Sequence, residues 1–263
     1  MNKCSARSIP GLFFALLLPL LVSCSAKVKN IETDPSFTND EMMSTKICIL
    51  GCTSIAVEKP ADMMLSNWLS NELKFALLEK REGIDVMPFG EVRRAAGESL
   101  MKQCLQEIHD YGSIDPALLD DLAKELPPDV KYAVVHRIET DRMKFEEDEN
   151  RQDRDGTSVV TGYTLKTIRM ITATLYVYDL QQGKQVFLAT IEGKDETKRE
   201  ITMNERVDLG GILGDVIDAA EAINEIFGDK SDERWENFPP PPTQDVVMRH
   251  IYNKFAEELP KKE

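Results

Sequence analysis

The sequence predicts an α/β fold built on a single mixed sheet with flanking helices. Short apolar runs that are typical of buried strands alternate with amphipathic helical stretches, beginning with a strand–helix–strand unit over 46–87. Two later strand-like runs, near 167–191, lie on either side of a turn signal and predict an antiparallel hairpin. The composition, 42% hydrophobic and 30% charged in 263 residues, is ordinary for a globular chain and excludes wholesale disorder or several membrane spans.

The chain begins with the pattern of a bacterial export signal. Lys3 and Arg7 supply a short cationic start. The uncharged run over 11–22 that follows is too short for a spanning helix of roughly 20 residues. This run ends in the tetrapeptide Leu21-Val22-Ser23-Cys24.

That tetrapeptide resembles the lipobox of bacterial lipoproteins, which places a branched apolar residue and a small residue ahead of a cysteine that becomes acylated. The resemblance implies a signal peptide over 1–23, cleavage between Ser23 and Cys24, and fatty acyl chains such as palmitate on Cys24. Each buried CH₂ group of such a chain contributes about 0.8 kcal/mol to membrane binding. Ser25 stands where enterobacterial sorting would use Asp for inner-membrane retention, so we expect an outer-membrane anchor with the domain facing the periplasm. The alternative is a chance cysteine behind an ordinary signal peptide.

The charge balance argues against a nucleic-acid partner. The chain has 32 Lys and Arg residues against 46 Asp and Glu residues, a formal net charge of −14. Phosphate binding requires a basic footprint instead. Loss of Lys3 and Arg7 with the signal peptide makes the mature chain −16. Such an acidic surface favours a protein partner with a basic face.

Three cysteines remain once Cys4 is removed with the signal peptide and Cys24 is lipidated. Cys48 and Cys52 would lie roughly 13 Å apart in an extended chain, beyond the limit of about 7 Å for a disulfide. One of them could pair with Cys104. Buried free thiols are the favoured interpretation, because the number is odd and cysteine is among the most buried residue types.

The elements follow in order behind the anchor. Residues 24–45 are polar without periodicity and predict a tether. The apolar run 46–50 predicts a buried strand, and a short strand is expected over 84–87. Between them, 62–80 predicts a helix with one buried stripe, because its apolar residues recur at three and four positions. These are Leu65, Trp68, Leu69, Leu73, Ala76 and Leu77.

Further helices and a central strand are predicted next. A looser helical stretch covers 91–109, and Asp115 with Pro116 supplies the N-cap and first-turn proline of a helix that ends before Pro127. The run 130–138 is apolar on both faces, as expected for a central strand. Residues 141–157 have no face to bury and carry seven acidic residues, so they predict a solvated excursion.

The hairpin is the clearest local feature. Strands are expected over 167–178 and 186–191, and Gly183 in the loop between them stands where a positive φ is needed. A helix over 210–227 follows. An acidic and proline-rich linker over 229–243 then delivers the final helix, 244–259 in a C-terminal segment 244–263, to its docking place.

This order of elements resembles the CsgG/LpoB-like periplasmic lipoprotein domain, over roughly 46–228. Its most specific pieces are the hairpin from Ala173 to Phe187 and the helix and strand from Asn71 to Val86. The family contains the curli secretion channel and an activator of penicillin-binding proteins, so the resemblance implies a pore subunit or a protein-binding module. A pore is disfavoured, because charges at the density found over 141–155 and 192–200 are costly on lipid-facing strands.

No motif in the sequence predicts catalysis, a metal site or a cofactor. The histidines His109, His136 and His250 lack the settings that nucleophilic or zinc chemistry uses. His136 lies on an apolar strand face and is expected to be a hydrogen-bonded core residue. The glycines over 210–214 open a helix without the Lys-Ser/Thr of a phosphate-binding loop.

The sequence therefore predicts a lipid-anchored, non-catalytic protein-binding module that regulates an envelope or wall-synthesis machine. Two alternatives stay open. One is a self-assembling subunit of an envelope secretion or export apparatus, which would form a homo-oligomer. The other is a hydrolase whose site no motif reveals.

Overall fold

The computed structural model describes residues 25–56, 63–154, 156–202 and 237–262. Its strands are β1 (Ser25–Thr33), β2 (Lys46–Ser54), β3 (Asp85–Met87), β4 (Val130–Arg154), β5 (Thr157–Asp179) and β6 (Lys184–Thr202). Its helices are α1 (Asn39–Ser44), α2 (Met63–Lys80), α3 (Phe89–Ala96), α4 (Glu98–Tyr111), α5 (Pro116–Glu125) and α8 (Gln244–Glu258).

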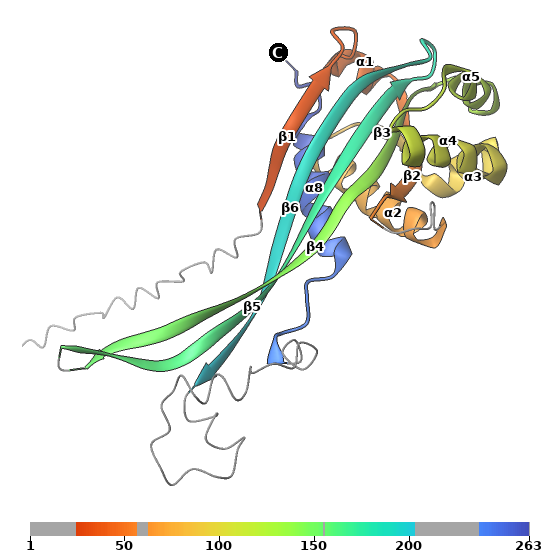
Figure 1. Ribbon diagram of the computed structural model, residues 1–263. Helices are drawn as coiled ribbons and strands as arrows, with labels where there is room; N and C mark the ends of the chain where they lie inside the picture. Colours follow the sequence, from red (N-terminus) through yellow and green to blue (C-terminus); the bar gives the residue numbers. More distant parts are fainter. Residues whose placement is uncertain (1–24, 57–62, 155, 203–236, 263) are drawn as a thin grey trace, which may run out of the picture.

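The strands form one mixed sheet in the order β1-β6-β5-β4-β2-β3 (Figure 1). β2 pairs in parallel with both β3 and β4, whereas the pairs β4–β5, β5–β6 and β1–β6 are antiparallel. The α/β class, the strand–helix–strand start and the hairpin are thereby confirmed. Gly183 has a φ of 61° in the β5–β6 loop, as predicted.

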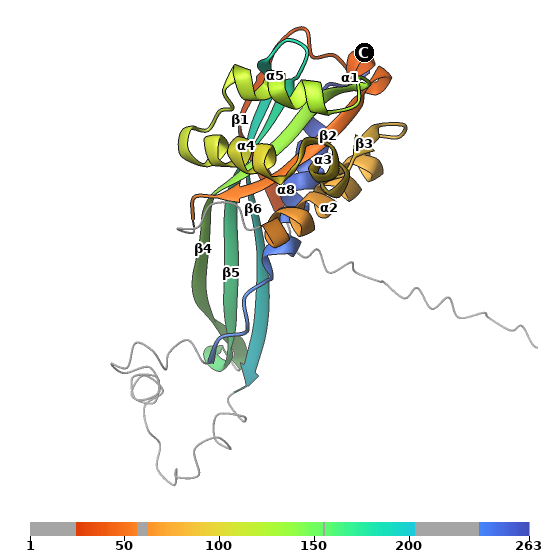
Figure 2. The same ribbon diagram turned by 90° about the vertical axis from the view of Figure 1, so that its right-hand side faces the viewer.

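The helices cover the two faces of the sheet unequally. We call the face under α1, α2 and α8 the α8 face, and the face under α3, α4 and α5 the α4 face (Figures 1 and 2). Two separate apolar clusters lie on these faces, one containing Leu73, Leu175 and Phe255 and the other containing Leu105 and Val135. Among the described helices, α3 and α4 contact β2, whereas α8 contacts β1, β5 and β6.

The predicted tether over 24–45 is wrong for the described residues. Ser25–Thr33 forms the edge strand β1, and α1 follows with Thr38 as its N-cap, whose side chain accepts a hydrogen bond from the Glu41 amide at 3.3 Å. Phe37 and Met42 are buried beside them. An edge strand needs only a sparse apolar face, here Ala26 and Val28, and that signal is too weak to separate from a polar coil.

The predicted excursion over 141–157 is also wrong. β4 continues without interruption to Arg154, which pairs with Thr157 across the turn to β5. The segment lacks an apolar period because most of its side chains are solvated. Its structure comes from backbone pairing with β5 along its whole length, so hydrophobic periodicity could not reveal it.

This continuation creates a projecting three-stranded ribbon. We define the ribbon as residues 143–154 of β4, 157–169 of β5 and 195–202 of β6, starting at the row in which Met143, Arg169 and Asp195 are paired. β2 ends opposite Ile138, and β1 begins opposite Lys194. From this row on, β4 and β6 therefore have no described strand on their outer sides. At about 3.3 Å per residue, β4 extends roughly 40 Å beyond it. Figure 1 shows the ribbon leaving the helix-covered body of the protein.

The predicted helices are largely confirmed. The stretch 91–109 divides at Gly97 into α3 and α4, and Asp115 caps α5 by accepting a hydrogen bond from the Ala117 amide at 2.8 Å. The C-terminal helix α8 packs on the α8 face, as Val247, Ile251 and other buried residues show. No helix within the described ranges is both long and apolar enough to cross a membrane.

Several predicted features lie outside the described residues. They are the signal peptide with Ser23 and Cys24, the helix expected over 210–227, and the part of the linker over 229–236.

Candidate interaction surface

The ribbon is the candidate functional site, because it carries exposed strand edges and a dense set of charges. Its β4 edge contains the unbroken acidic run Glu146, Glu147, Asp148 and Glu149. Within the described chain, no strand pairs with the outer side of β4 beyond Ile138. A strand edge with open backbone groups is a docking template, and its charges determine which partners it accepts.

The α4 face of the ribbon carries a network of ion pairs. Lys166 on β5 pairs across the strands with Asp148 on β4. Along single strands, Lys144 contacts Glu146 at 2.6 Å and Lys198 contacts Glu196 at 2.6 Å. In each pair one side chain is more than half exposed, so each pair contributes little to stability and is open to exchange with a partner.

The base of the ribbon is braced on the α8 face by residues 237–243. The Thr167 hydroxyl donates to the carbonyl of Pro239, and the Thr197 hydroxyl donates to that of Pro240, both at 2.6 Å. The guanidinium of Arg169 donates to the Pro242 carbonyl at 3.2 Å and binds both carboxylate oxygens of Asp141, at 2.8 and 2.5 Å.

The described residues of the predicted linker, 237–243, are therefore held against β5 and β6 through their backbone carbonyls. An aromatic contact adds to this brace, since the rings of Phe145 and Phe238 meet edge to face with centroids 5.3 Å apart. The brace holds the ribbon in a defined direction relative to the body, as a rigid binding element requires.

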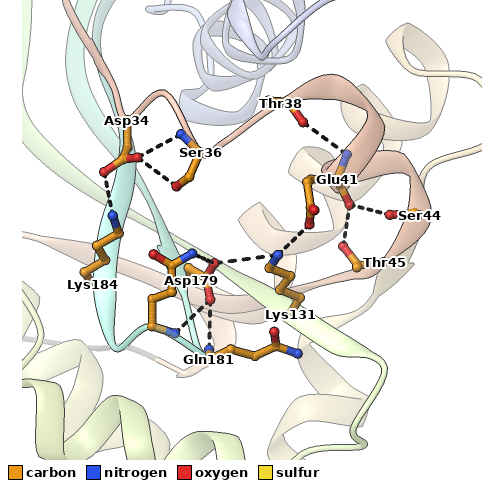
Figure 3. A network of polar contacts seen from close by, with 11 residues as sticks. Asp34, Ser36, Thr38, Glu41, Ser44, Thr45, Lys131, Asp179, Gln181 and Lys184 are labelled. Atoms are coloured by element: carbon orange, nitrogen blue, oxygen red, sulfur yellow. Dashed lines mark hydrogen bonds and ion pairs between the residues drawn. The ribbon is translucent and has the colours of Figure 1, made fainter.

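A polar network ties the opposite end of the sheet together (Figure 3). Asp34, after β1, accepts hydrogen bonds from Lys184 Nζ at 2.7 Å and from the Ser36 amide at 2.9 Å. These bonds hold the pKa of Asp34 far below its usual range. Beside it, Lys131 Nζ contacts Glu41 at 2.5 Å, and that hydrogen bond raises the pKa of Lys131.

Asp179 belongs to the same network. It is buried, and it accepts hydrogen bonds from the backbone amides of Gln181 and Gln182 at 2.9 and 3.0 Å. Asp34 thus joins the end of β1 to the β5–β6 hairpin, Glu41 joins α1 to β4, and Asp179 closes the hairpin loop. The network is therefore a structural joint.

The predicted core role of His136 is confirmed in part. Its Nε2 lies 2.8 Å from the hydroxyl of Tyr252 on α8, whereas its Nδ1 is buried without a hydrogen-bond partner. Burial lowers the pKa of His136 to about 3, so the ring is neutral at physiological pH. His109 contacts Asp110 at 2.7 Å, and no group of three or more His, Cys, Asp and Glu residues suited to a metal ion occurs in the described ranges.

Cys48, Cys52 and Cys104 are free and buried in the core, as predicted. Burial raises the pKa of Cys48 and Cys52 well above the usual thiol range, and it raises that of Cys104 to about 12. Protonated, enclosed thiols are poor nucleophiles.

The predicted site residues Ser23 and Cys24 lie directly before the described chain. Ser25 is already the first residue of β1 and pairs with Lys194 of β6. The predicted attachment point is thus one residue from the sheet edge, beside the base of the ribbon.

The ribbon itself was missed by sequence analysis, although one signal pointed to it. Lys194, Glu196, Lys198 and Glu200 alternate in charge at a period of two residues. That period places all four on one face of a strand.

Comparisons with known proteins identify no family for this chain. No protein-family model matches the sequence, and no functionally curated protein matches it. Solved structures with a similar chain course include the PelC dodecamer from Paraburkholderia phytofirmans, at 14% identity over 65% of this chain and 81% of that chain, with a TM-score of 0.28.

Two lipoproteins are also similar at this level. Lipoprotein GNA1162 from Neisseria meningitidis is 12% identical over 70% of this chain and 99% of its own, with a TM-score of 0.32. A minor lipoprotein from Acinetobacter baumannii is 13% identical over 84% of this chain and 97% of its own, with a TM-score of 0.26. None of these comparisons names a CsgG/LpoB-like protein, so that resemblance stays a prediction.

Proposed function

We propose that the protein is a lipid-anchored, non-catalytic binding module of the bacterial cell envelope, and that the ribbon is its binding element. The observation that carries this proposal is the projecting, braced ribbon with exposed edges. A strand edge can add a partner strand through main-chain hydrogen bonds, while neighbouring side chains set specificity. The ribbon extends away from the helix-covered body, where such an edge is accessible (Figure 2).

The partner proposed for the β4 edge is an envelope protein with a basic face. The acidic run over 146–149 lies on this edge, and Glu147, Asp148 and Glu149 are exposed. Electrostatic complementarity of this kind mainly raises the association rate and excludes partners of like charge. The same charge argues against nucleic acid as the ligand.

The anchor proposed is acylated Cys24 in the outer membrane, with the domain in the periplasm. The lipobox-like sequence that ends at Cys24 supports it. An anchor directly before β1 would keep the base of the ribbon close to the membrane. Partners held in the same envelope layer would then meet the ribbon at a raised effective concentration.

A hydrolase is the weaker proposal, because the most strongly perturbed acid and base groups described above are engaged within the fold. Asp34 and Asp179 form a joint, and His136 is enclosed in the core. Regulation of an envelope or wall-synthesis machine is the process we propose for the binding module.

In-cell photo-crosslinking tests the proposal. A photoreactive residue is introduced at Glu147 on the β4 edge, and as a control at Lys124 on the exposed side of α5. We expect discrete crosslinked bands containing a second envelope protein from position 147 and none from position 124. Crosslinks confined to position 124 would contradict the proposal.

A second experiment tests the anchor. In the Cys24→Ala variant we expect an uncleaved precursor that incorporates no palmitate. Normal palmitate labelling of that variant would remove the basis of the proposed localisation.

A further inference from the structure

The outer side of α2 carries a row of exposed apolar side chains. They are Met64, Trp68, Phe75 and Leu78, with exposed fractions of 83%, 43%, 63% and 44%. At 3.6 residues per turn, all four lie within about 80° of one another, on the side of the helix opposite the buried Leu73. The prediction that Trp68 belongs to the buried stripe of this helix is therefore wrong. Single exposed apolar residues are normal, whereas a contiguous row of them indicates an interaction surface.

The row has the spacing of a coiled coil. Together with Asn71 it occupies positions 64, 68, 71, 75 and 78, which are separated alternately by four and three residues. We call these five positions the α2 seam. Such a seam packs against the same seam of a second helix, and a single Asn within it specifies the register of the pair. Because α2 is already folded against β2 and α8, association does not have to form the helix.

Charged residues lie on both flanks of the α2 seam. Lys74 lies on one flank and Glu79 on the other. Neither belongs to an ion pair within the described residues, whereas Glu72 contacts Arg249 at 3.0 Å. In a parallel pair of helices, a residue on one flank meets the residue five positions further along on the opposite flank of the other helix. Lys74 of each copy would then meet Glu79 of the other.

We infer that α2 packs against α2 of a second copy of this chain, in parallel, about a two-fold axis that runs along the α2 seam. The axis sets each seam residue against its own counterpart, so Asn71 meets Asn71 and Phe75 meets Phe75. Both Lys74–Glu79 contacts are then of opposite sign. An antiparallel pair would instead bring Lys74 of one copy beside Lys74 of the other, which opposes association. The flanking charges therefore select the parallel arrangement.

The α2 seam is short, so the dimer depends on local concentration. From position 64 to position 78 it spans about 21 Å, at about 1.5 Å per residue. Copies confined to one membrane by the proposed anchor would meet at a raised effective concentration. This inference goes beyond the proposed function, since it concerns a different element of the fold and a different occupant from those proposed for the ribbon.

A cysteine in the α2 seam tests the pairing in cells that make the full-length chain. Leu78→Cys should give a disulfide-linked dimer under mild oxidation, because the two-fold axis brings the two positions 78 together. A disulfide requires Cα atoms less than about 7 Å apart. Lys102→Cys is the matched control, since Lys102 is an exposed residue of helix α4, and it should give no dimer. An antiparallel pair would place position 78 beside Trp68, so equal dimer yields from positions 78 and 102 would overturn the inference.

Charge reversal tests the direction of pairing, through co-purification of two differently tagged full-length chains. Lys74→Glu should lower co-purification roughly fivefold, because it places glutamate beside Glu79 of the other copy. The double variant Lys74→Glu, Glu79→Lys restores opposite charges at both contacts and should recover the wild-type yield. Lys102→Glu on α4 is the control and should leave the yield unchanged. Failure of the double variant to recover the yield would contradict the parallel arrangement.

A photoreactive residue in place of Phe75 distinguishes the possible occupants of the α2 seam. Phe75 is 63% exposed, so the replacement should leave the unfolding temperature unchanged. We expect a crosslinked product of twice the subunit mass that contains only this chain. Crosslinks to a different protein alone, or to lipid alone, would overturn the inference. Photo-crosslinking from position 147 is measured in the same cells, so failure of the dimer is distinguishable from failure of the proposed function.

Discussion

β4 passes through two different environments, and the difference shows what specifies a strand in each. In the body, Ala133 and Val134 point to opposite faces of the sheet and both are buried. In the ribbon, the same strand carries Glu146 and Glu147 on its two faces. Burial fixes the strand in the body, whereas in the ribbon backbone pairing with β5 and the brace of residues 237–243 fix it. A fold element held mainly by backbone pairing leaves its side chains available for binding.

The largest expected contrast comes from one substitution made in each region of β5. Ile171 is fully buried in the body, and Ile168 is only partly buried in the ribbon. Ile171→Ala should lower the free energy of unfolding by about 3 kcal/mol, because it leaves a cavity in the core. Ile168→Ala should cost less than about 1 kcal/mol. Urea denaturation measures both, and equal losses would contradict the division into body and ribbon.

The pH dependence of stability should come in part from the body, through His136. Unfolded histidine takes up a proton near pH 6.5, whereas burial lowers the pKa of His136 in the folded protein to about 3. The unfolded state therefore binds more protons as the pH falls, and His136 should cost about 2 kcal/mol of stability at pH 5.

His136→Gln removes this titration. Its free energy of unfolding should change less between pH 7 and pH 5 than that of the wild type, when both are measured by urea denaturation. Identical pH profiles of the two proteins would show that His136 is not enclosed as described.

Two glycines should respond to alanine for different reasons. A Cβ at Gly193 would lie 2.7 Å from Cγ1 of Ile251, so Gly193→Ala should push α8 from the sheet and cost about 2 kcal/mol. Gly156, in the ribbon turn, has a φ of 78° and nothing within 4 Å of a built Cβ. Gly156→Ala should cost about 1 kcal/mol, through backbone strain alone. Thermal unfolding compares them, and a larger loss at Gly156 would contradict the packing of α8.

The smallest expected difference in stability is between replacing a lysine of the joint and replacing a lysine of the ribbon. Lys131 in the joint is mostly buried and contacts Glu41, whereas Lys144 in the ribbon is exposed. Lys131→Met should cost about 1 kcal/mol and Lys144→Met less than about 0.5 kcal/mol. The effect of Lys144→Met should vanish in 1 M salt, where the Debye length is about 3 Å. A salt-independent loss at Lys144 would indicate a structural role in the ribbon.

The division between body and ribbon also explains what the sequence could predict. Most elements of the body were predicted, because the apolar runs over 46–50 and 130–138 and the apolar stripe of α2 indicate buried elements. The extension of β4 to Arg154 and the edge strand β1 were missed, because solvated strands carry little apolar signal and depend on a partner distant in the chain.

For the candidate site, the sequence supplied the charges without their placement. The acidic residues over 141–155 predict a solvated segment and disfavour a pore, but they do not show that the segment is a strand. Their position on one edge depends on the strand order and on the end of β2 opposite Ile138, which no local pattern specifies.

Neutralising one edge of the ribbon tests the central claim most directly. The triple variant Glu147→Gln, Asp148→Asn, Glu149→Gln removes three exposed acidic charges from β4. The control triple Asp120→Asn, Asp121→Asn, Glu125→Gln removes three from α5. The yield of the envelope partner is measured by in-cell chemical crosslinking and mass spectrometry. We expect the ribbon variant to lose most of the partner and the α5 variant to retain it, with both proteins unfolding at the wild-type temperature. Equal partner yields from the two variants would contradict the assignment of the ribbon as the binding element.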